Sequence, residues 1–445
     1  MSGVDLVSVC CVASGGGTSK GYAAMFAGVA LVILATTGVF NPWPKVWTWV
    51  TASGPIAEGA AQWQVKLSGS PESVAFADDA VIVEYRTRVE SYGLGAGIKL
   101  WQSDDDWASV AGGSADSVVV TGKLLTKGYQ VREPRSGRVR RTDTSATAVW
   151  AYANAIVDLR CVKGGECELR AWDPRGSRPL WTVSTGGIGF VLDAANPDLP
   201  DTQPLGSTQI DAGVAGRPYM PFLMGLPDDG RVRIVDTAAG RVVQTVTPGP
   251  DERISVTGGR VLTVTGTAQD GTCYYSVVAT DPPAGRVWSR DGLNLRTAAN
   301  GSACKQDRDP VGGEDVVLGV DPTGREELIA AHDGRRLWYG DKDQDVVAVN
   351  DGYAVIRSPD KRTFTGRSFT GGGSNWRRSV NDGAAAAMSP YATIIANTSP
   401  RRIIAVSPTG GQVLVETRTE AKVFASGPTG LIAVDGRDMV YLPFR

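Results

Sequence analysis

Histidine is nearly absent from this sequence of 445 residues, and its scarcity limits the catalytic chemistry available to the chain. The single histidine, His332, lies in the stretch AHDGRR, which predicts a hairpin turn. Histidine is the side chain that most often transfers protons near neutral pH, and no serine or cysteine nucleophile motif accompanies this one. We therefore predict no catalytic residue, and the sequence does not favour an enzyme.

An excess of charge of either sign is also missing. Lys and Arg number 45 against 47 Asp and Glu, which gives a net charge of −2 at neutral pH. Proteins that attract nucleic acid or an anionic membrane surface through their overall charge are usually strongly basic. The composition therefore excludes a general polyanion partner, and we expect no nucleic acid partner.

Helical periodicity is missing from Trp63 to the C-terminus, where no stretch places apolar residues at i, i+3, i+4 and i+7. Short apolar runs take its place, among them AVIVEY at 80–85 and ATIIAN at 392–397. Nine such runs follow one another, and the fourth lies at 219–226. This pattern is typical of β-strands, so the sequence predicts an all-β fold.

A short phrase with a glycine turn follows most of these runs. It takes the forms AWDPRGSRPLW (171–181), TDPPAGRVW (280–288) and HDGRRLW (332–338). Its glycine supplies the positive φ that a tight hairpin often needs. Between the hairpin glycines Gly97, Gly137, Gly176, Gly240, Gly285 and Gly334, the steps are 40, 39, 64, 45 and 49 residues, the length of a four-stranded propeller blade plus variable loops.

These units predict one β-propeller over residues 63–445, because a lone four-stranded sheet leaves apolar faces uncovered and a ring of sheets covers them. The strand QWQVKL at 62–67 can complete the last blade by pairing with the C-terminal strands. We expect about eight blades, with seven to nine open, since the irregular spacing near 186–218 leaves one of the nine runs uncertain. The closed ring predicts a monomer.

The segment 22–40, YAAMFAGVALVILATTGVF, contains no charged residue. A helix of this length reaches roughly 28 Å at about 1.5 Å per residue, close to the hydrocarbon thickness of a bilayer. Tryptophans follow it, where aromatic rings favour the headgroup region. We expect a short cytoplasmic tail over 1–20, a transmembrane helix over 21–41 and a juxtamembrane linker over 42–62. A cleaved signal peptide and a buried helix of a soluble fold are the alternatives.

The cysteines orient this predicted anchor. Cys161 and Cys167 bracket the turn sequence VKGGE, and Cys273 and Cys304 lie within one further repeat. Two plausible disulfides, Cys161–Cys167 and Cys273–Cys304, indicate an oxidising compartment, whereas four free thiols in a cytosolic domain are the alternative. We therefore expect a single-pass protein of the cell membrane with its propeller on the extracytoplasmic side.

The repeated phrase resembles the repeat of PQQ-like β-propellers, a group that includes quinoprotein dehydrogenases and an outer-membrane assembly lipoprotein. In that family the tryptophans matching Trp181, Trp288 and Trp338 pack between blades. The repeats at Gly137 and Gly240 lack the tryptophan. The quinoproteins of the group hold a quinone beside calcium, an aspartate and often a disulfide between adjacent cysteines. The adjacent pair here precedes the predicted membrane helix, and no CxxCH haem motif exists, so we expect no cofactor.

Two acidic stretches are weak candidates for calcium. DKDQD places Asp341, Asp343 and Asp345 at alternate positions, as in the first part of a calcium loop, but it lacks the glycine and the glutamate that such a loop needs. A solvated turn is the alternative. DDD at 104–106 has still less of the pattern, so we predict no metal site.

Two features are candidates for recognition. VREPRSGRVRR concentrates Arg132, Arg135, Arg138, Arg140 and Arg141 around one hairpin, which suits an acidic protein, a phosphorylated polymer or lipid headgroups; a hairpin charged for solubility is the alternative. The long connection 186–218 is either a recognition loop or a plain surface loop. We expect a protein-binding or envelope-assembly scaffold whose partner is an unidentified envelope protein or polymer. A quinone-dependent or other envelope oxidoreductase is the alternative.

Overall fold

The computed structural model describes one unit of the chain, within residues 55–445. The described residues are 56–57, 59–113, 115–162, 166–185, 218–228, 230–282, 284–295, 304, 314–370, 376–398 and 401–445. They contain strands and turns, and they form no helix that is long and apolar enough to cross a membrane. The predicted tail, transmembrane helix and most of the linker lie outside the described residues.

The described strands form nine antiparallel sheets, which we number as blades 1–9 along the chain. Blade 1 contains β2 (Ser73–Ala77), β3 (Ala80–Tyr85), β4 (Arg88–Gly93) and β5 (Lys99–Ser103). Blade 2 contains β6 (Trp107–Ala111), β7 (Val118–Gly122), β8 (Tyr129–Arg132) and β9 (Val139–Asp143). Blade 3 contains β10 (Ala148–Ala151), β11 (Ile156–Cys161), β12 (Cys167–Trp172) and β13 (Pro179–Thr185). Blade 4 contains β14 (Leu223–Asp228), β15 (Arg231–Asp236) and β16 (Arg241–Val246).

The second half of the chain continues the series. Blade 5 contains β17 (Glu252–Thr257), β18 (Arg260–Gln269), β19 (Thr272–Asp281) and β20 (Gly285–Asp291). Blade 6 contains β21 (Asn294–Leu295), β22 (Val316–Val320), β23 (Glu326–Ala330) and β24 (Arg336–Tyr339). Blade 7 contains β25 (Asp345–Val349), β26 (Tyr353–Arg357), β27 (Thr363–Ser368) and β28 (Trp376–Ser379). Blade 8 contains β29 (Ala385–Met388), β30 (Thr393–Thr398), β31 (Arg401–Val406) and β32 (Val413–Arg418). Blade 9 contains β33 (Lys422–Ser426), β34 (Gly430–Asp435), β35 (Asp438–Pro443) and β1 (Trp63–Lys66).

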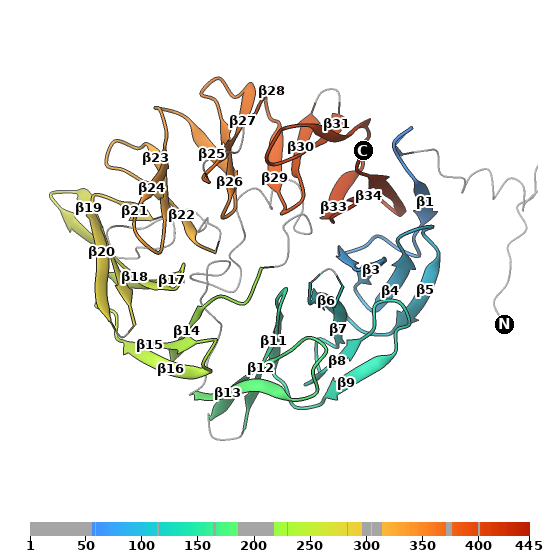
Figure 1. Ribbon diagram of the computed structural model, residues 1–445, viewed down its shortest axis with the longest axis horizontal. Helices are drawn as coiled ribbons and strands as arrows, with labels where there is room; N and C mark the ends of the chain where they lie inside the picture. Colours follow the sequence, from blue (N-terminus) through green and yellow to red (C-terminus); the bar gives the residue numbers. More distant parts are fainter. Residues whose placement is uncertain are drawn as a thin grey trace, which may run out of the picture. The chain divides into compact units, whose positions relative to one another are not determined.

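The nine sheets succeed one another around a ring, so the fold is a β-propeller (Figure 1). In blade 5, for example, β17 lies towards the centre of the ring and β20 lies at the rim. The predicted closure is confirmed: β1, from the start of the described chain, pairs antiparallel with β35, matching Trp63 with Tyr441 and Lys66 with Asp438. This pairing joins the two ends of the ring through main-chain hydrogen bonds.

The estimate of eight blades is wrong by one, although nine falls within the range that the sequence left open. The irregular spacing near 186–218 directly precedes the apolar run at 219–226. That run contributes β14, which is the first of three described strands in blade 4. The other eight apolar runs each supply the second strand of a four-stranded blade.

The core lies between neighbouring blades, which explains why these runs are apolar on both faces. In β7, Val118, Val119 and Val120 are all fully buried. Val118 and Val120 belong to one apolar cluster with Ile156 and Trp172 of blade 3, so one face of the sheet packs against the next blade. A strand covered on both faces is typically a continuous apolar run rather than an alternating one.

A tryptophan at the rim of one blade packs over the hairpin glycine of the next. The Nε1 of Trp288 in blade 5 donates a hydrogen bond to the carbonyl oxygen of Ala331 in blade 6 at 2.8 Å. A Cβ at Gly334 would lie 2.7 Å from the Trp288 ring, and Gly334 has a φ of 73°, so only glycine fits without strain. The same contact joins Trp63 with Gly97, Trp101 with Gly137, Trp181 with Gly240 and Trp376 with Gly411.

The repeated phrase is therefore a contact between blades as well as a hairpin. The predicted packing role is confirmed for Trp181 and Trp288, and Trp338 lies in an apolar cluster shared by blades 6 and 7. Gly176 is an exception, because it does not have the positive φ that the sequence predicts for a hairpin glycine. Its N–H instead donates to the carbonyl oxygen of Asp173 at 3.0 Å, closing a tighter turn.

Gly240→Ala is expected to lower the free energy of unfolding by about 3 kcal/mol or more, from backbone strain plus overpacking. Gly240 has a φ of 61°, and an added Cβ would lie 2.2 Å from the Cβ of Trp181. Gly436→Ala is a matched control. Gly436 also has a positive φ, 58°, but a Cβ added there would have no atom within 4 Å. Backbone strain alone is therefore expected to cost this variant about 1–2 kcal/mol. Denaturant titration compares the two variants, and equal losses would contradict the tryptophan contact.

Candidate functional site

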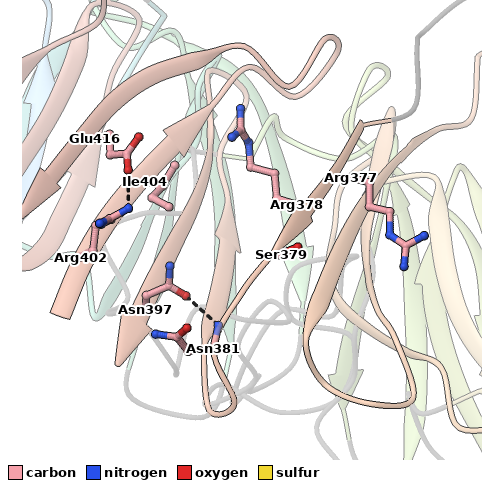
Figure 2. Close-up of a pocket in the computed structure, with 8 residues that line it drawn as sticks. All are labelled: Arg377, Arg378, Ser379, Asn381, Asn397, Arg402, Ile404 and Glu416. Carbon is pink, nitrogen blue, oxygen red and sulfur yellow. Dashed lines mark hydrogen bonds and ion pairs between the residues drawn. The ribbon is translucent and has the colours of Figure 1, made fainter. Parts of the chain in front are cut away.

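Arginine side chains line two grooves between neighbouring blades. One of about 430 Å³ lies between blades 7 and 8 (Figure 2). The other, of about 330 Å³, lies between β9 of blade 2 and the turn 173–178 of blade 3. The second groove contains part of the arginine cluster that the sequence predicted.

The structure divides this predicted cluster into two groups. Arg132 is held inside its own blade, where it donates to Thr121 Oγ1 at 3.2 Å and lies 3.5 Å from Asp105 Oδ2. Arg135 forms an ion pair with Asp79 of blade 1. The remaining three arginines line the groove with six further residues: Val131, Arg138, Val139, Arg140, Arg141, Pro174, Arg175, Gly176 and Ser177.

The sequence did not predict the second wall of this groove. Arg175, Gly176 and Ser177 belong to the hairpin turn of the next blade, more than 30 residues beyond the arginine-rich hairpin. The Nη2 of Arg140 reaches across to the carbonyl oxygen of Arg175 at 3.4 Å. The inter-blade packing of the propeller therefore brings a fourth arginine to the cluster.

Few carboxylates neutralise the groove. Glu133 forms ion pairs with both Arg140 and Arg138, the latter at 3.6 Å. Arg175 lies 3.6 Å from Asp116, whose side chain is 77 % exposed, and 3.8 Å from Asp78, whose side chain is 23 % exposed, so two carboxylates partly neutralise it. Among the described residues, no carboxylate oxygen lies within 4.0 Å of the Arg141 guanidinium. Positive charge is therefore in excess here.

Arg141 occupies the position that other blades give to tryptophan. In blade 1, Trp101 pairs with Ser91, and the strand register shifts directly after Ser91. In blade 2, Arg141 pairs with Val131, and the register shifts directly after Val131, so Arg141 and Trp101 are at equivalent positions. Its guanidinium lies 4.1 Å from the centre of the Trp172 ring, and its Nη1 donates to the carbonyl oxygen of Gly176 at 3.0 Å. Arginine thus makes the inter-blade contact by a cation–π interaction and a hydrogen bond.

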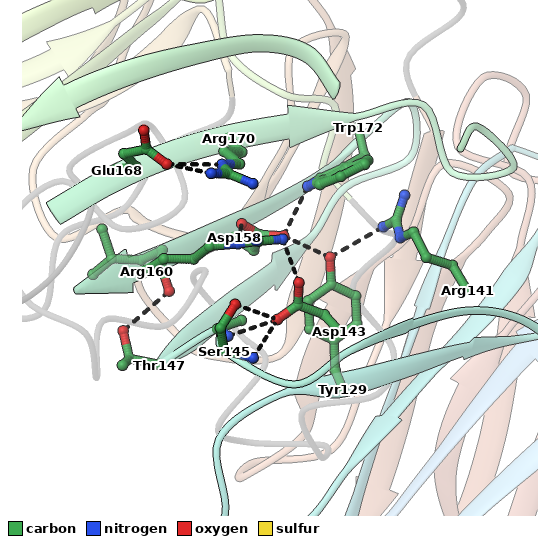
Figure 3. A network of polar contacts seen from close by, with 12 residues as sticks. Tyr129, Arg141, Asp143, Ser145, Thr147, Asp158, Arg160, Glu168, Arg170 and Trp172 are labelled. Carbon is green, nitrogen blue, oxygen red and sulfur yellow. Dashed lines mark hydrogen bonds and ion pairs between the residues drawn. The ribbon is translucent and has the colours of Figure 1, made fainter. Parts of the chain in front are cut away.

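A buried network holds Arg141 in place (Figure 3). Asp158 is fully buried and accepts hydrogen bonds at 2.7 Å from both the Tyr129 hydroxyl and the Trp172 Nε1. The Tyr129 oxygen in turn accepts a hydrogen bond from Arg141 Nη2 at 3.1 Å. On the far side, Arg160 links Asp158 to Asp143 through its Nε at 3.4 Å and an ion pair from Nη2.

The protonation state of Tyr129 keeps this network intact. Burial raises the pKa of the Tyr129 hydroxyl, and the nearby Asp158 carboxylate raises it further. Tyr129 therefore stays protonated and donates to Asp158 near neutral pH. The Nε of Arg141 is buried and has no hydrogen-bond partner among the described residues, so a ligand in the groove does not reach it. Nη1 and Nη2 each use one N–H in the bonds described above, and the second N–H of each is what this fixed guanidinium offers to an anion.

His332 lies outside both grooves. Its Nδ1 is 2.5 Å from Asp315 Oδ2, its Nε2 is 3.3 Å from Asp333 Oδ2, and its side chain is 46 % exposed. Each ring nitrogen faces a carboxylate, so His332 links the turn between β23 and β24 to Asp315, the residue that precedes β22. Neither of these contacts of the His332 ring is with a serine or cysteine side chain.

The acidic candidates form turns. Asp341 and Gln344 exchange hydrogen bonds across DKDQD, and Asp345 pairs with Arg357 at 2.7 Å. In the other stretch, Asp105 faces Arg132, and Asp106 accepts a hydrogen bond from the N–H of Leu124 at 3.1 Å. Within the described residues, no three His, Cys, Asp or Glu side chains are placed to hold a metal ion together.

Both predicted disulfides are present. Cys161 and Cys167 are directly paired on β11 and β12 with a Cα–Cα distance of 4.1 Å, and Cys273 of β19 is bonded to Cys304. The second bond connects blade 5 to the segment between β21 and β22 of blade 6. The candidate recognition loop 186–218 lies outside the described residues, apart from its last residue.

The comparisons with known proteins show no family: no family model matches the chain, and no curated protein matches it. Among solved structures, the chain is similar to BamB from Moraxella catarrhalis, with 14 % identity, 86 % of this chain and 99 % of that chain covered, and a TM-score of 0.38. It is also similar to a eukaryotic initiation factor (11 % identity, 85 % and 92 % covered, TM-score 0.44). A computationally designed protein, Ika8, matches with 13 % identity, 85 % and 98 % covered, and a TM-score of 0.37.

Proposed function

We propose that the chain is a binding scaffold of the cell envelope, in which the groove between blades 2 and 3 holds an acidic partner. The observation that carries this proposal is the fixed guanidinium of Arg141 among three further arginines. Arg140 and Arg141 come from one blade and Arg175 from the next, so a rigid inter-blade contact sets their spacing. Prepositioned arginines bind carboxylate or phosphate oxygens with little loss of side-chain entropy.

We further propose a single-pass membrane protein, with residues 21–41 as the anchor and the propeller on the extracytoplasmic side. The apolar segment 22–40 supports the anchor. The two disulfides support an oxidising compartment, because disulfides persist mainly outside the cytosol. The tryptophan-on-glycine contact between blades supports membership of the PQQ-like propeller group, whose repeat the sequence resembles.

The double variant Arg138→Gln/Arg140→Gln is expected to reduce recovery of the partner roughly tenfold, because it removes charge-assisted hydrogen bonds to the acidic partner. The measurement is a pull-down of the full-length protein after crosslinking in intact membranes, with the captured material quantified by mass spectrometry. Arg138 is 73 % exposed and Arg140 pairs only with Glu133 and a carbonyl oxygen, so both changes should leave the fold intact.

Arg135→Gln is the matched control. Arg135 lies in the same hairpin and is 68 % exposed, but it faces Asp79 of blade 1 rather than the groove. Its replacement is expected to leave recovery of the partner unchanged. If both variants lose the partner equally, or if the double variant captures as much as the wild type, the groove is not the binding site.

A further inference from the structure

The connection between β13 and β14, residues 186–217, carries charge of almost one sign only. Its sequence has no lysine or histidine, and its one arginine, Arg217, is its last residue. Four aspartates precede that arginine: Asp193, Asp198, Asp201 and Asp211. The connection lies outside the described residues, but the residues on both sides of it are described. A stretch with an excess of one charge is attracted to a surface of the opposite charge.

Both ends of this acidic connection are attached to blade 3, which provides one wall of the groove between blades 2 and 3. The connection begins after Thr185, the last residue of β13. At its other end, the carbonyl oxygen of Pro218 accepts a hydrogen bond at 2.8 Å from the N–H of Ala153, in the turn between β10 and β11. The N–H of Met220 donates to Asn154 Oδ1 in the same turn at 2.8 Å. The chain is therefore fixed to blade 3 before it enters β14.

This point of attachment lies near the groove. Ile156 of β11 is directly opposite Trp172 of β12. The turn 152–155 directly precedes Ile156 and the turn 173–178, which lines the groove, directly follows Trp172, so both turns leave the same end of the sheet. Because paired strands are only about 5 Å apart, Pro218 is within roughly 15 Å of this wall of the groove.

The aspartates of the connection can reach the groove from Pro218. Asp211 precedes Pro218 by seven residues, and an extended chain of that length spans up to about 23 Å. Asp201 precedes Pro218 by seventeen residues, and a coil of that length averages about 23 Å from end to end. Both distances exceed the separation of roughly 15 Å, so chain length does not prevent the contact.

The groove offers these aspartates donors that the described residues do not use up. Four arginines line it, and three carboxylates lie within 4.0 Å of them: Glu133, Asp78 and Asp116. Arg138 is 73 % exposed and its only listed carboxylate neighbour, Glu133, is 3.6 Å away and is shared with Arg140. A guanidinium only donates hydrogen bonds, and a carboxylate is its best acceptor.

We propose that the acidic connection 186–217 is an intramolecular ligand of the groove between blades 2 and 3 and competes there with the acidic partner. The inference rests on the proposed function, because both ligands use the same arginines. A tethered ligand has an effective concentration on the order of millimolar, so weak contacts between carboxylates and guanidinium groups are enough to hold it. The partner binds only while the connection is out of the groove, which lowers the apparent affinity of the chain for that partner.

Carbodiimide crosslinking of the full-length protein tests the intramolecular contact without the partner. The reagent joins a carboxylate to a neighbouring amine, and Arg138→Lys supplies an amine in the groove while keeping the positive charge. We expect crosslinked peptides that join position 138 to an aspartate of the connection in the same chain. Arg135→Lys is the matched control, because Arg135 lies in the same hairpin but faces Asp79 of blade 1. Its crosslink is expected to be with Asp79 and not with the connection.

Mixing chains of normal and heavy-isotope composition before crosslinking distinguishes one chain from two. Crosslinks of position 138 within one chain support the proposal. It is overturned if position 138 forms no crosslink to the connection, if the crosslink joins only different chains, or if position 135 reacts with the connection equally well.

Neutralising the connection tests the competition. Asp198→Asn/Asp201→Asn/Asp211→Asn removes three of the four negative charges and keeps the size of each side chain. In the pull-down from crosslinked membranes, this variant is expected to recover about threefold more partner than the wild type, or more, because its groove is free for a larger fraction of the time. Thr202→Ala/Gln203→Ala changes the same connection without changing its charge, and it is expected to leave recovery unchanged.

The outcomes separate this inference from the proposed function. If the neutralised connection recovers no more partner than the wild type while Arg138→Gln/Arg140→Gln still lowers recovery, the competition is overturned and the proposed function holds. If Arg138→Gln/Arg140→Gln leaves recovery unchanged while position 138 crosslinks to the connection, the proposed function fails and the groove keeps its intramolecular ligand.

Discussion

Asp158→Ala is expected to lower the free energy of unfolding by about 3–5 kcal/mol, the usual cost of removing one partner of a buried charged network. The Asp158 carboxylate is fully buried and accepts hydrogen bonds from Tyr129 and Trp172, each at 2.7 Å. Its second oxygen lies 3.4 Å from the Arg160 Nε. Alanine would leave these donors without an acceptor inside the protein, and unsatisfied buried donors are costly.

Glu168→Ala is the matched control for Asp158→Ala. Glu168 lies on the neighbouring strand β12 and pairs with Arg170, but its side chain is 44 % exposed. An exposed pair contributes about 0–1 kcal/mol, so this variant is expected to unfold almost like the wild type. Denaturant unfolding followed by tryptophan fluorescence measures both. If Asp158→Ala loses no more stability than Glu168→Ala, the buried network does not stabilise blades 2 and 3.

The strands of this propeller could be predicted from sequence because each blade repeats the same local chemistry. The second strand is covered on both faces, so it is a continuous apolar run, as in Val118–Val120. A hairpin glycine such as Gly334 marks the turn before the rim strand, since no other residue fits its φ and its tryptophan neighbour. The blade number was less certain because the spacing before β14 is irregular, although its apolar run is present.

The candidate site could be predicted only in part, because a groove between blades has two walls that are distant in sequence. The arginine-rich hairpin indicates Arg138, Arg140 and Arg141, but nothing in that stretch predicts that Arg175 completes the groove. The groove of blades 7 and 8 brings Arg378 of β28 close to blade 8, where it donates to the carbonyl oxygen of Gly411, and nothing in the sequence near either residue predicts this contact. Inter-blade register, not local sequence, brings these side chains together.

The Gly137 repeat lacks the tryptophan of other repeats, and its replacement makes the same contact between blades by different interactions. Arg141 stands there, and it keeps the contact to the next blade by stacking on Trp172 and bonding the carbonyl oxygen of Gly176. The contact between blades is thus conserved in geometry while its chemistry changes from apolar to cationic. The sequence shows only that the Gly137 repeat lacks the tryptophan, and it does not show which side chain makes the contact instead.

Trp376→Ala is expected to lower the free energy of unfolding by about 3–5 kcal/mol, as for other buried large-to-small substitutions. Trp376 is only 7 % exposed, and its side chain packs against two glycines. A Cβ at Gly366 of its own blade would be 2.1 Å from the indole, and one at Gly411 of blade 8 would be 2.4 Å from the Trp376 Cβ. Alanine would leave a cavity on both sides of the inter-blade contact.

Two further variants separate the apolar and polar parts of this contact. Trp376→Phe keeps an aromatic ring but removes the hydrogen bond from Nε1 to the carbonyl oxygen of Pro408 at 3.1 Å, so a smaller loss of about 1–2 kcal/mol is expected. Tyr274→Ala removes an aromatic ring that is 55 % exposed and is expected to stay within about 0.5 kcal/mol of the wild type. Calorimetric and denaturant unfolding measure the stability of all three variants. If Trp376→Ala lowers the free energy of unfolding by less than about 1 kcal/mol, the tryptophan-on-glycine contact does not hold neighbouring blades together.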